Sequence, residues 1–209
     1  MSNKAKITLT LLLVGIFFAI STVIWHQKNT AQHFPAQLLE KQPTIGDSNA
    51  EHHIIVFEDL KCNNCAVFSS TVLSKIKKTY VKNNKASLTL VTLAFIPGSK
   101  PAGNAALCLY QQNPSYFFDY VEYIYRHQPN ESDDWATATR LIKFAQSATP
   151  HADLNSLADC IIQERYHGYL EHNLTLARKV MGNDVRTPAV FVDNKPVQPT
   201  LEHIKNALD

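Results

Sequence analysis

The chain has 209 residues, of which 45% are hydrophobic and 18% are charged, and its formal net charge is only +2 at pH 7 with histidine neutral. Its lysines are scattered rather than gathered in runs, which argues against a nucleic-acid binding surface. About 180 residues follow an apolar N-terminal stretch, enough for one well-buried domain and too few for two ordinary ones.

The first 25 residues have the pattern of a membrane signal. Lys4 and Lys6 precede an uncharged stretch from Ile7 to Trp25. About nineteen residues at about 1.5 Å each almost span the roughly 30 Å hydrocarbon core of a bilayer and exceed the usual core of a secretory signal. We therefore expect an uncleaved anchor over 1–25, and the alternative is a cleaved signal peptide with the cut near Ala31. The lysines place the N-terminus in the cytoplasm and the rest of the chain outside, where disulfides persist.

A polar segment over 26–44 contains two prolines and is expected to tether the membrane segment to a folded domain over 45–209. The first strand of this domain is predicted near His53–Glu58, because its core from Ile54 to Phe57 is apolar without interruption. Such a run is typical of a strand buried on both faces, so this strand should be central in its sheet.

The motif Cys62-Asn63-Asn64-Cys65 lies directly after this strand and directly before a helical pattern. A helix N-terminus carries roughly half a positive elementary charge and unpaired N–H groups, and both favour a thiolate over a thiol. Cys62 is therefore predicted to be the nucleophile, with its pKa lowered by about two to three units. A structural zinc site would want further ligands, and no second CxxC or HxxxH occurs. A purely structural bridge across so short a loop would add little stability.

A helix is predicted after the motif, from Ala66 onward, because apolar residues recur there at every fourth position (Phe68, Val72, Ile76 and Tyr80). The segment Ser87–Ile96 concentrates β-forming residues and ends at a proline-glycine pair, so it is predicted to be the second strand.

From Ser99 to about Met181 the pattern is helical throughout, which predicts an all-helical insert over 99–181. Breaks occur at Asn113-Pro114, Pro129-Asn130 and Thr149-Pro150. Helix N-caps are predicted at Asp133 and Asp153. Six aromatic residues lie at helical spacing in the insert, and we interpret them as core rather than as a ligand platform: Tyr116, Phe117, Phe118, Tyr120, Tyr123 and Tyr125.

Two further cysteines, Cys108 and Cys160, both lie in the insert and are flanked by apolar residues. Buried free cysteines are common, so two separate thiols are one alternative. An even cysteine count in an exported chain favours a structural disulfide instead, which would close a loop of about fifty residues and stabilise the fold by about 4 kcal/mol.

After the insert, Ala189–Val192, a turn at Asp193-Asn194 and Lys195–Val197 predict a β-hairpin. A closing helix is predicted from about Thr200 to Leu208. The expected order is therefore strand, helix, strand, helical insert, hairpin and helix.

Three separated motifs carry a resemblance to a known family. They are Ile45-Gly46-Asp47-Ser48-Asn49-Ala50, the run from Val56 through Cys62 to Cys65, and Val185-Arg186-Thr187-Pro188-Ala189-Val190-Phe191-Val192-Asp193. With these motifs the chain resembles the DsbA-type thiol-disulfide oxidoreductases, particularly the membrane-anchored branch similar to the Gram-positive BdbD proteins. The resemblance spans nearly everything after Gly46. It implies an α/β architecture, a thioredoxin fold with an all-helical domain inserted between the second strand and the C-terminal β-hairpin.

The resemblance also implies residue roles: Cys62 attacks, Cys65 resolves, and Pro188 follows a cis peptide bond in a loop that faces the dithiol. A cis bond between Thr187 and Pro188 at the mouth of a strand can shape a backbone edge for an extended substrate chain. Without the surrounding motif, an ordinary trans proline would be expected.

The motif departs from the family at two places. Asn63 and Asn64 stand where proline and histidine are common, so a cationic or polarisable neighbour of the thiolate is missing. Arg186 stands where glycine is common, and Arg186 or Lys61 could return a positive charge to the site. The alternative is that both cations are solvated surface charges.

The expected function is a bacterial enzyme that introduces disulfides into reduced exported proteins and is reoxidised by a membrane partner of the DsbB type. No cofactor beyond its own disulfide and no metal is expected, and the protein should be a monomer. It is placed at the inner membrane by a single N-terminal span with its domain on the periplasmic or extracytoplasmic side, or secreted after signal cleavage. The lowered thiol pKa predicts a disulfide more oxidising than that of thioredoxin by roughly 60 to 90 mV. The alternatives are a disulfide reductase or isomerase, and a non-catalytic thioredoxin-fold protein that binds copper.

Overall fold

The computed structural model describes residue 39 and residues 41–209 of the chain. The predicted membrane segment over 1–25 and most of the predicted tether lie outside the described residues. Within the described part, no helix combines the length and the apolar character needed to cross a bilayer.

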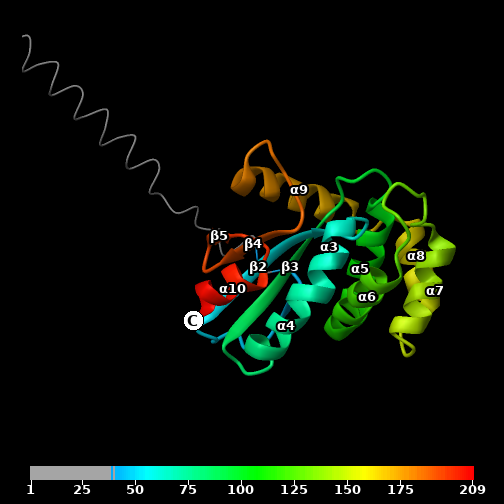
Figure 1. Cartoon of the computed structure of the whole chain (residues 1–209). Coiled ribbons are helices and arrows are strands. Elements are labelled where there is room, and N and C mark those ends of the chain that lie inside the picture. Colours follow the sequence, from blue (N-terminus) through cyan, green and yellow to red (C-terminus); the bar gives the residue numbers. More distant parts are fainter. Residues whose placement is uncertain (1–38, 40) are drawn as a thin grey trace, which may run out of the picture. The chain divides into compact units, whose positions relative to one another are not determined.

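A five-stranded mixed sheet forms the centre of the domain, in the order β1-β3-β2-β4-β5 (Figure 1). The strands are β1 (Thr44–Ile45), β2 (His52–Asp59), β3 (Ala86–Leu93), β4 (Ala189–Val192) and β5 (Lys195–Val197). β2 runs parallel to β3 and antiparallel to β4, and the two outer pairs, β1–β3 and β4–β5, are antiparallel.

The prediction that the first strand is central is confirmed. β2 lies between β3 and β4, and its residues Ile54 to Asp59 are all buried. β3 is buried along its whole length and ends at Leu93, three residues before the predicted Ile96. Phe95 and Ile96 leave the sheet because their backbone N–H groups donate to the carboxylate of Asp59 instead of to a neighbouring strand.

The helix after the dithiol begins at Asn63, earlier than predicted, and alternates between α-helical and wider π-helical turns. Its segments are α3 (Asn63–Phe68), η1 (Ser69–Leu73), α4 (Ser74–Ile76) and η2 (Lys77–Val81). In a regular α-helix a four-residue spacing drifts around the helix, because four residues turn by more than 360°. The wider π-turns offset this drift, so Phe68, Ile76 and Tyr80 are all buried.

The insert is helical as predicted, and its helices are α5 (Lys100–Gln112), α6 (Pro114–His127), α7 (Ala138–Ala148), α8 (Leu154–Ile162) and α9 (His167–Met181). Asp153 caps α8 as predicted, and its side chain accepts hydrogen bonds from two backbone N–H groups. The predicted cap at Asp133 is wrong, because α7 begins after Thr137. Trp135, only 1% exposed, lies in the turn between them.

The two faces of the sheet are covered by different elements (Figure 1). α9 packs on one face, where Leu176 and Ala177 join an apolar cluster with Ile55 and Phe57. The opposite face is covered by the α3–η2 helix and by α10 (Leu201–Leu208), and this larger cluster continues into the insert. The aromatic residues of α6 belong mostly to that core, as predicted: Phe117, Phe118, Tyr120 and Tyr125 are buried.

The hairpin and the closing helix match the prediction. Asp193 and Asn194 both have positive φ, as a tight hairpin turn requires, and Thr200 caps α10. The short strand β1 was not predicted. Just before it, the buried side chain of Gln42 donates a hydrogen bond to Asn173 of α9 over 2.6 Å, so this part of the chain contributes to the folded domain.

Candidate active site

The dithiol lies at the C-terminal end of the central strand, where the chain turns into α3. The backbone N–H of Cys62 donates to the carbonyl of Asp59 at 2.9 Å, which closes the turn. Cys62 is the N-cap of α3, and its Sγ accepts a hydrogen bond from the backbone N–H of Cys65 at 3.4 Å. A sulfur atom therefore takes the place that a serine or aspartate oxygen takes at an ordinary helix N-cap.

The loop before β4 lies against Cys62. The peptide bond between Thr187 and Pro188 is cis, as the resemblance implied. The Cys62 thiol donates to the carbonyl oxygen of Thr187 over 3.5 Å, across 125 residues of sequence. The structure thus brings four of the predicted site residues together, namely Cys62, Cys65, Thr187 and Pro188.

The surroundings of Cys62 favour its thiolate. A hydrogen bond from the Cys65 side chain is the largest effect and lowers the pKa of Cys62 to about 6 against the opposing effect of burial. The backbone N–H groups of Cys65 and Asn64 add to this lowering. The size of the shift agrees with the sequence prediction, but its main source is the second cysteine. Cys62 is also buried, with 5% of its surface exposed.

Cys65 has the opposite environment. It is 2% exposed, and burial together with its hydrogen bond to Cys62 raises its pKa well above the ordinary value. At neutral pH the reduced pair therefore holds one thiolate, on Cys62, and one thiol, on Cys65.

Glu58 is a site residue that the sequence analysis did not identify. Its carboxyl group is buried below the dithiol, where the Tyr125 hydroxyl donates to Oε2 at 3.0 Å and the Thr92 hydroxyl donates to Oε1 at 3.4 Å. Burial raises the pKa of Glu58 to about 8, and both Asp59 and the Cys62 thiolate raise it further. An acidic residue at the end of an otherwise apolar central strand was the available signal.

Asp59 and Lys61 hold the loop after β3 rather than the dithiol. The carboxylate of Asp59 accepts hydrogen bonds from the hydroxyl of Ser99 and from three backbone N–H groups, although burial raises its pKa. Lys61 is 3% exposed, so it is not a solvated surface charge, and its ammonium group donates to the carbonyl of Pro97 at 2.9 Å. Arg186 pairs with Asp184 at 3.0 Å and is exposed. Each cation thus has a polar partner outside the dithiol.

The two asparagines of the motif have different surroundings. The backbone N–H of Asn63 donates to a carboxylate oxygen of Glu131 at 2.9 Å, and its side chain accepts from Gln128 at 3.4 Å. Asn64 is exposed. Glu131 and Gln128 follow α6, so the insert contributes polar groups to the N-terminus of α3 that sequence spacing did not reveal.

Cys108 and Cys160 form the predicted disulfide, which joins α5 to α8 with a Cα–Cα distance of 6.1 Å. It lies within the insert and is separate from the Cys62–Cys65 pair. In the described part of the chain, no group of three or more His, Cys, Asp or Glu side chains is arranged to hold a metal ion.

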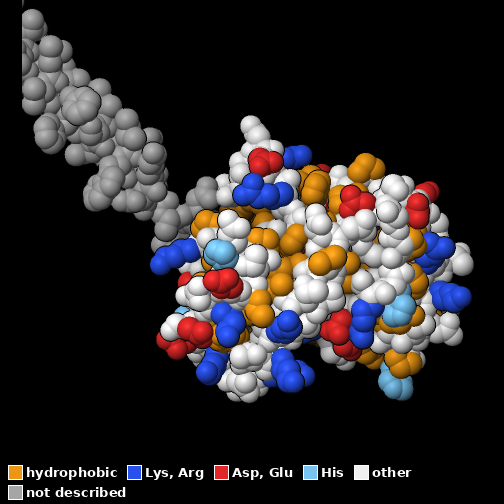
Figure 2. Space-filling model, in the orientation of Figure 1, with side chains coloured by type: hydrophobic (Ala, Val, Ile, Leu, Met, Phe, Trp, Pro, Cys, Tyr) orange, Lys and Arg blue, Asp and Glu red, His pale blue; other side chains and the backbone are white. Residues whose placement is uncertain are grey.

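A groove of about 560 Å³ adjoins the cis-proline loop. Its lining includes Met181, Arg186, Pro188, Phe191 and Pro196, so it runs from the end of α9 to the β4–β5 hairpin. Figure 2 shows apolar side chains near the centre of one face of the domain and charged side chains mostly toward its margins.

Comparisons with known proteins agree with this geometry. Residues 38–209 match a protein-family model described as thioredoxin. The disulfide bond formation protein D of Bacillus subtilis (strain 168) is 27% identical over 161 residues, which cover 77% of this chain and 71% of that protein. The crystal structure of Chlamydia trachomatis DsbA superposes with a TM-score of 0.76 at 34% identity, covering 81% of this chain and 90% of that one. Oxidised BdbD from Bacillus subtilis superposes with a TM-score of 0.75 at 26% identity, covering 81% of this chain and 92% of that one.

Proposed function

The chain belongs to the thioredoxin family and is a DsbA-type thiol-disulfide oxidoreductase, and from that premise we propose that it introduces disulfides into exported proteins through Cys62 and Cys65. The proposal that the enzyme oxidises rather than reduces its substrates rests on the pKa of Cys62, which its surroundings lower to about 6. A stabilised thiolate stabilises the reduced dithiol, and the disulfide form is a stronger oxidant for that reason.

The magnitude follows from the pKa. The nucleophilic thiol of thioredoxin has a pKa of about 7, so a value of about 6 lowers the free energy of the reduced form by at most about 1.4 kcal/mol relative to thioredoxin. This corresponds to about 30 mV for a two-electron couple. Thiolate stabilisation thus supplies about 30 of the 60 to 90 mV expected from the sequence.

The reaction begins with the Cys62–Cys65 disulfide and a reduced substrate. A substrate thiolate attacks Sγ of Cys62, the bond between the two cysteines breaks, and Cys65 leaves as a thiolate. Because Cys65 is buried and its thiol form is favoured, its sulfur takes a proton, and Glu58 is the buried acid that can supply it. A second substrate thiolate then attacks the substrate sulfur of the mixed disulfide and releases Cys62 as a thiolate.

The substrate chain is proposed to lie along the loop at Thr187. The carbonyl of this residue is 3.5 Å from Sγ of Cys62, so a substrate backbone paired with the loop brings its cysteine to the nucleophile. The groove beside Pro188 would then accept a neighbouring apolar side chain of the substrate.

The cellular setting is proposed from the sequence. The uncharged stretch from Ile7 to Trp25 anchors the domain on the outer side of the membrane, or is removed near Ala31. A membrane reoxidant of the DsbB type restores the disulfide after each turnover, and the protein acts as a monomer. Reduced exported proteins are its substrates.

The deciding experiment measures the reduction potential of the Cys62–Cys65 couple in the purified full-length chain, by equilibration with glutathione. We expect a value above that of thioredoxin, which is about −270 mV, with up to about 30 mV of the difference supplied by the Cys62 thiolate. A potential at or below that of thioredoxin would identify a reductase and overturn the proposed direction.

Trapping experiments test the two cysteine roles. Cys62→Ser should abolish exchange, because the attacked sulfur is lost, whereas Cys65→Ser should accumulate mixed disulfides between Cys62 and substrates. Electrophoresis without reductant detects these adducts. Adducts formed by Cys62→Ser instead of Cys65→Ser would reverse the assignment.

A further inference from the structure

A surface cleft opens between the helix that follows the dithiol and helix α6. It has a volume of about 190 Å³ and is lined from one side by Ser69, Ser70, Ser74 and Lys77, and from the other side by Glu122, Tyr125 and Arg126. The first set comes from the segments η1 to η2, where two π-helical turns widen the helix.

A second, smaller cavity adjoins this cleft and is lined by Glu58. It is a void of about 10 Å³, about the least that holds one water molecule. Four residues line both the void and the cleft, namely Ser69, Lys77, Glu122 and Tyr125. The side chains of Ser69, Tyr125 and Glu58 supply the polar partners that a buried water molecule needs.

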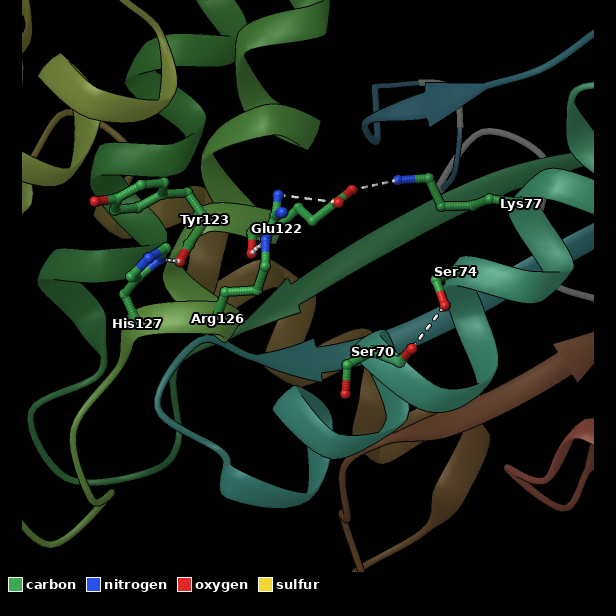
Figure 3. Close-up of polar contacts among 7 residues, drawn as sticks. All are labelled: Ser70, Ser74, Lys77, Glu122, Tyr123, Arg126 and His127. Atoms are coloured by element: carbon green, nitrogen blue, oxygen red, sulfur yellow. Dashed lines mark hydrogen bonds and ion pairs between the residues drawn. The ribbon is translucent and has the colours of Figure 1, made fainter.

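Charged groups join the two sides of the cleft (Figure 3). Glu122 accepts a hydrogen bond from Lys77 at 3.0 Å on one carboxylate oxygen and from Arg126 at 3.0 Å on the other. These ion pairs lower the pKa of Glu122, so it stays ionised at neutral pH. The Lys77 contact joins η2 to α6 across the cleft.

We propose that this cleft is the route by which Glu58 exchanges protons with solvent, with Ser69, which lines both cavities, as a positioning residue for the water that connects them. The inference rests on the proposed function, because it assigns Glu58 a proton to move. Glu58 is 2% exposed. The titratable and polar groups in contact with Glu58 or close to it are Tyr125 from α6, Thr92 from β3, Asp59 from β2, and Cys62 and Cys65 from the start of α3. Lys77 from η2 and Glu122 from α6 line the same void.

The route matters most when the reduced enzyme is reoxidised. In a mixed disulfide between Cys62 and glutathione, Cys65 must lose its proton before it attacks Sγ of Cys62. Burial keeps Glu58 largely protonated at pH 7, so it must first release its own proton through the cleft. The Glu58 carboxylate then takes the Cys65 proton, the Cys62–Cys65 bond forms, and glutathione leaves as a thiolate. Glu58 keeps that proton and is protonated again as at the start, so one proton, which left through the cleft, and one glutathione thiolate are released in total.

The test blocks the cleft and measures this resolving step. The full-length chain is prepared as the Cys62–glutathione mixed disulfide, and release of glutathione is followed by stopped flow between pH 6 and 9. Ser69→Leu places a larger apolar side chain where the void meets the cleft. Thr71→Leu is the matched control, because Thr71 is exposed on the same segment and is not among the residues that line either cavity.

We expect Ser69→Leu to slow glutathione release at pH 7 by at least about tenfold, since a positioned proton acceptor typically contributes a hundredfold or more. The equilibrium constant with glutathione should stay within about twofold of the unchanged chain, because a route changes rates and not end states. Thr71→Leu should behave as the unchanged chain does. If Ser69→Leu does not fold, Ser69→Val with Thr71→Val is measured under the same criteria.

An unchanged rate in the folded Ser69 variant overturns the proposal. So does an equal slowing in the Thr71 variant, which would indicate a general effect on the helix, or a shift of the equilibrium constant that accounts for the rate. A failure of the proposed function is distinguishable, because a reducing potential of the unchanged chain would leave the resolving step and its cleft dependence measurable.

Discussion

Replacing Cys65 by alanine tests the origin of the reactive thiolate. The Cys65 side chain is the largest single contributor to the lowered pKa of Cys62, and alanine removes it while keeping the backbone N–H that donates to Sγ of Cys62 at 3.4 Å. Hydrogen bonds to charged groups contribute about 1.5 to 3 kcal/mol. At about 1.4 kcal/mol per pKa unit, the pKa of Cys62 should then rise by about one to two units.

The consequence is measurable at neutral pH. With a pKa of about 6, about nine-tenths of Cys62 is thiolate at pH 7. In Cys65→Ala that fraction should fall to between about one half and one tenth. Alkylation by iodoacetamide, followed between pH 4 and 9 together with the ultraviolet absorbance of the thiolate, reports the pKa directly.

Asn64→Ala is the control, because Asn64 contributes through its backbone N–H, which alanine retains. Its alkylation profile should match that of the unchanged reduced chain. An unaltered Cys62 pKa in Cys65→Ala would refute the reasoning, and would assign the stabilisation to the helix N-terminus alone.

Three further predictions concern the surroundings of the dithiol. Burial raises the pKa of Glu58 from 4.5 to about 8, so ionisation of Glu58 destabilises the folded state increasingly as pH rises through this range. Glu58→Gln should therefore raise the free energy of unfolding by a few kcal/mol at pH 8 and change it little at pH 4. Equal effects at the two pH values would contradict this. Replacing Cys108 and Cys160 by alanine opens a 52-residue loop and should lower the free energy of unfolding by about 4 kcal/mol in denaturant titrations, with the Cys62 alkylation rate unchanged. Lys61→Met should lower the free energy of unfolding by about 1 kcal/mol, because the carbonyl of Pro97 loses its buried hydrogen-bond donor, whereas Arg186→Met should not lower it. A raised Cys62 pKa in either variant would show that the charge of the replaced residue reaches the thiolate.

Local patterns account for the parts of the fold that the sequence predicted well. The apolar run at Ile54 to Phe57 is typical of a strand buried on both faces, and β2 is central. The Asp193-Asn194 turn located the hairpin to the residue, because both side chains tolerate positive φ. The N-cap of α7 could not be located in the same way, since Asp133 and Thr137 are both suitable caps. In the structure Thr137 is the cap, and Trp135 between the two candidates is buried.

The amino-acid sequence by itself determined the reactive pair and its chemistry, because a CxxC motif between a buried strand and a helix places the first sulfur at the helix N-terminus wherever the rest of the chain goes. Only the tertiary structure decided the groups that act on that pair. Thr187 meets Cys62 across 125 residues, and Tyr125 meets Glu58 across 67. The cleft to Glu58 likewise exists only because α6 of the insert lies beside η1 and η2. Such contacts depend on how the insert packs against the sheet, and packing is set by the shapes of whole faces, which no short sequence pattern records.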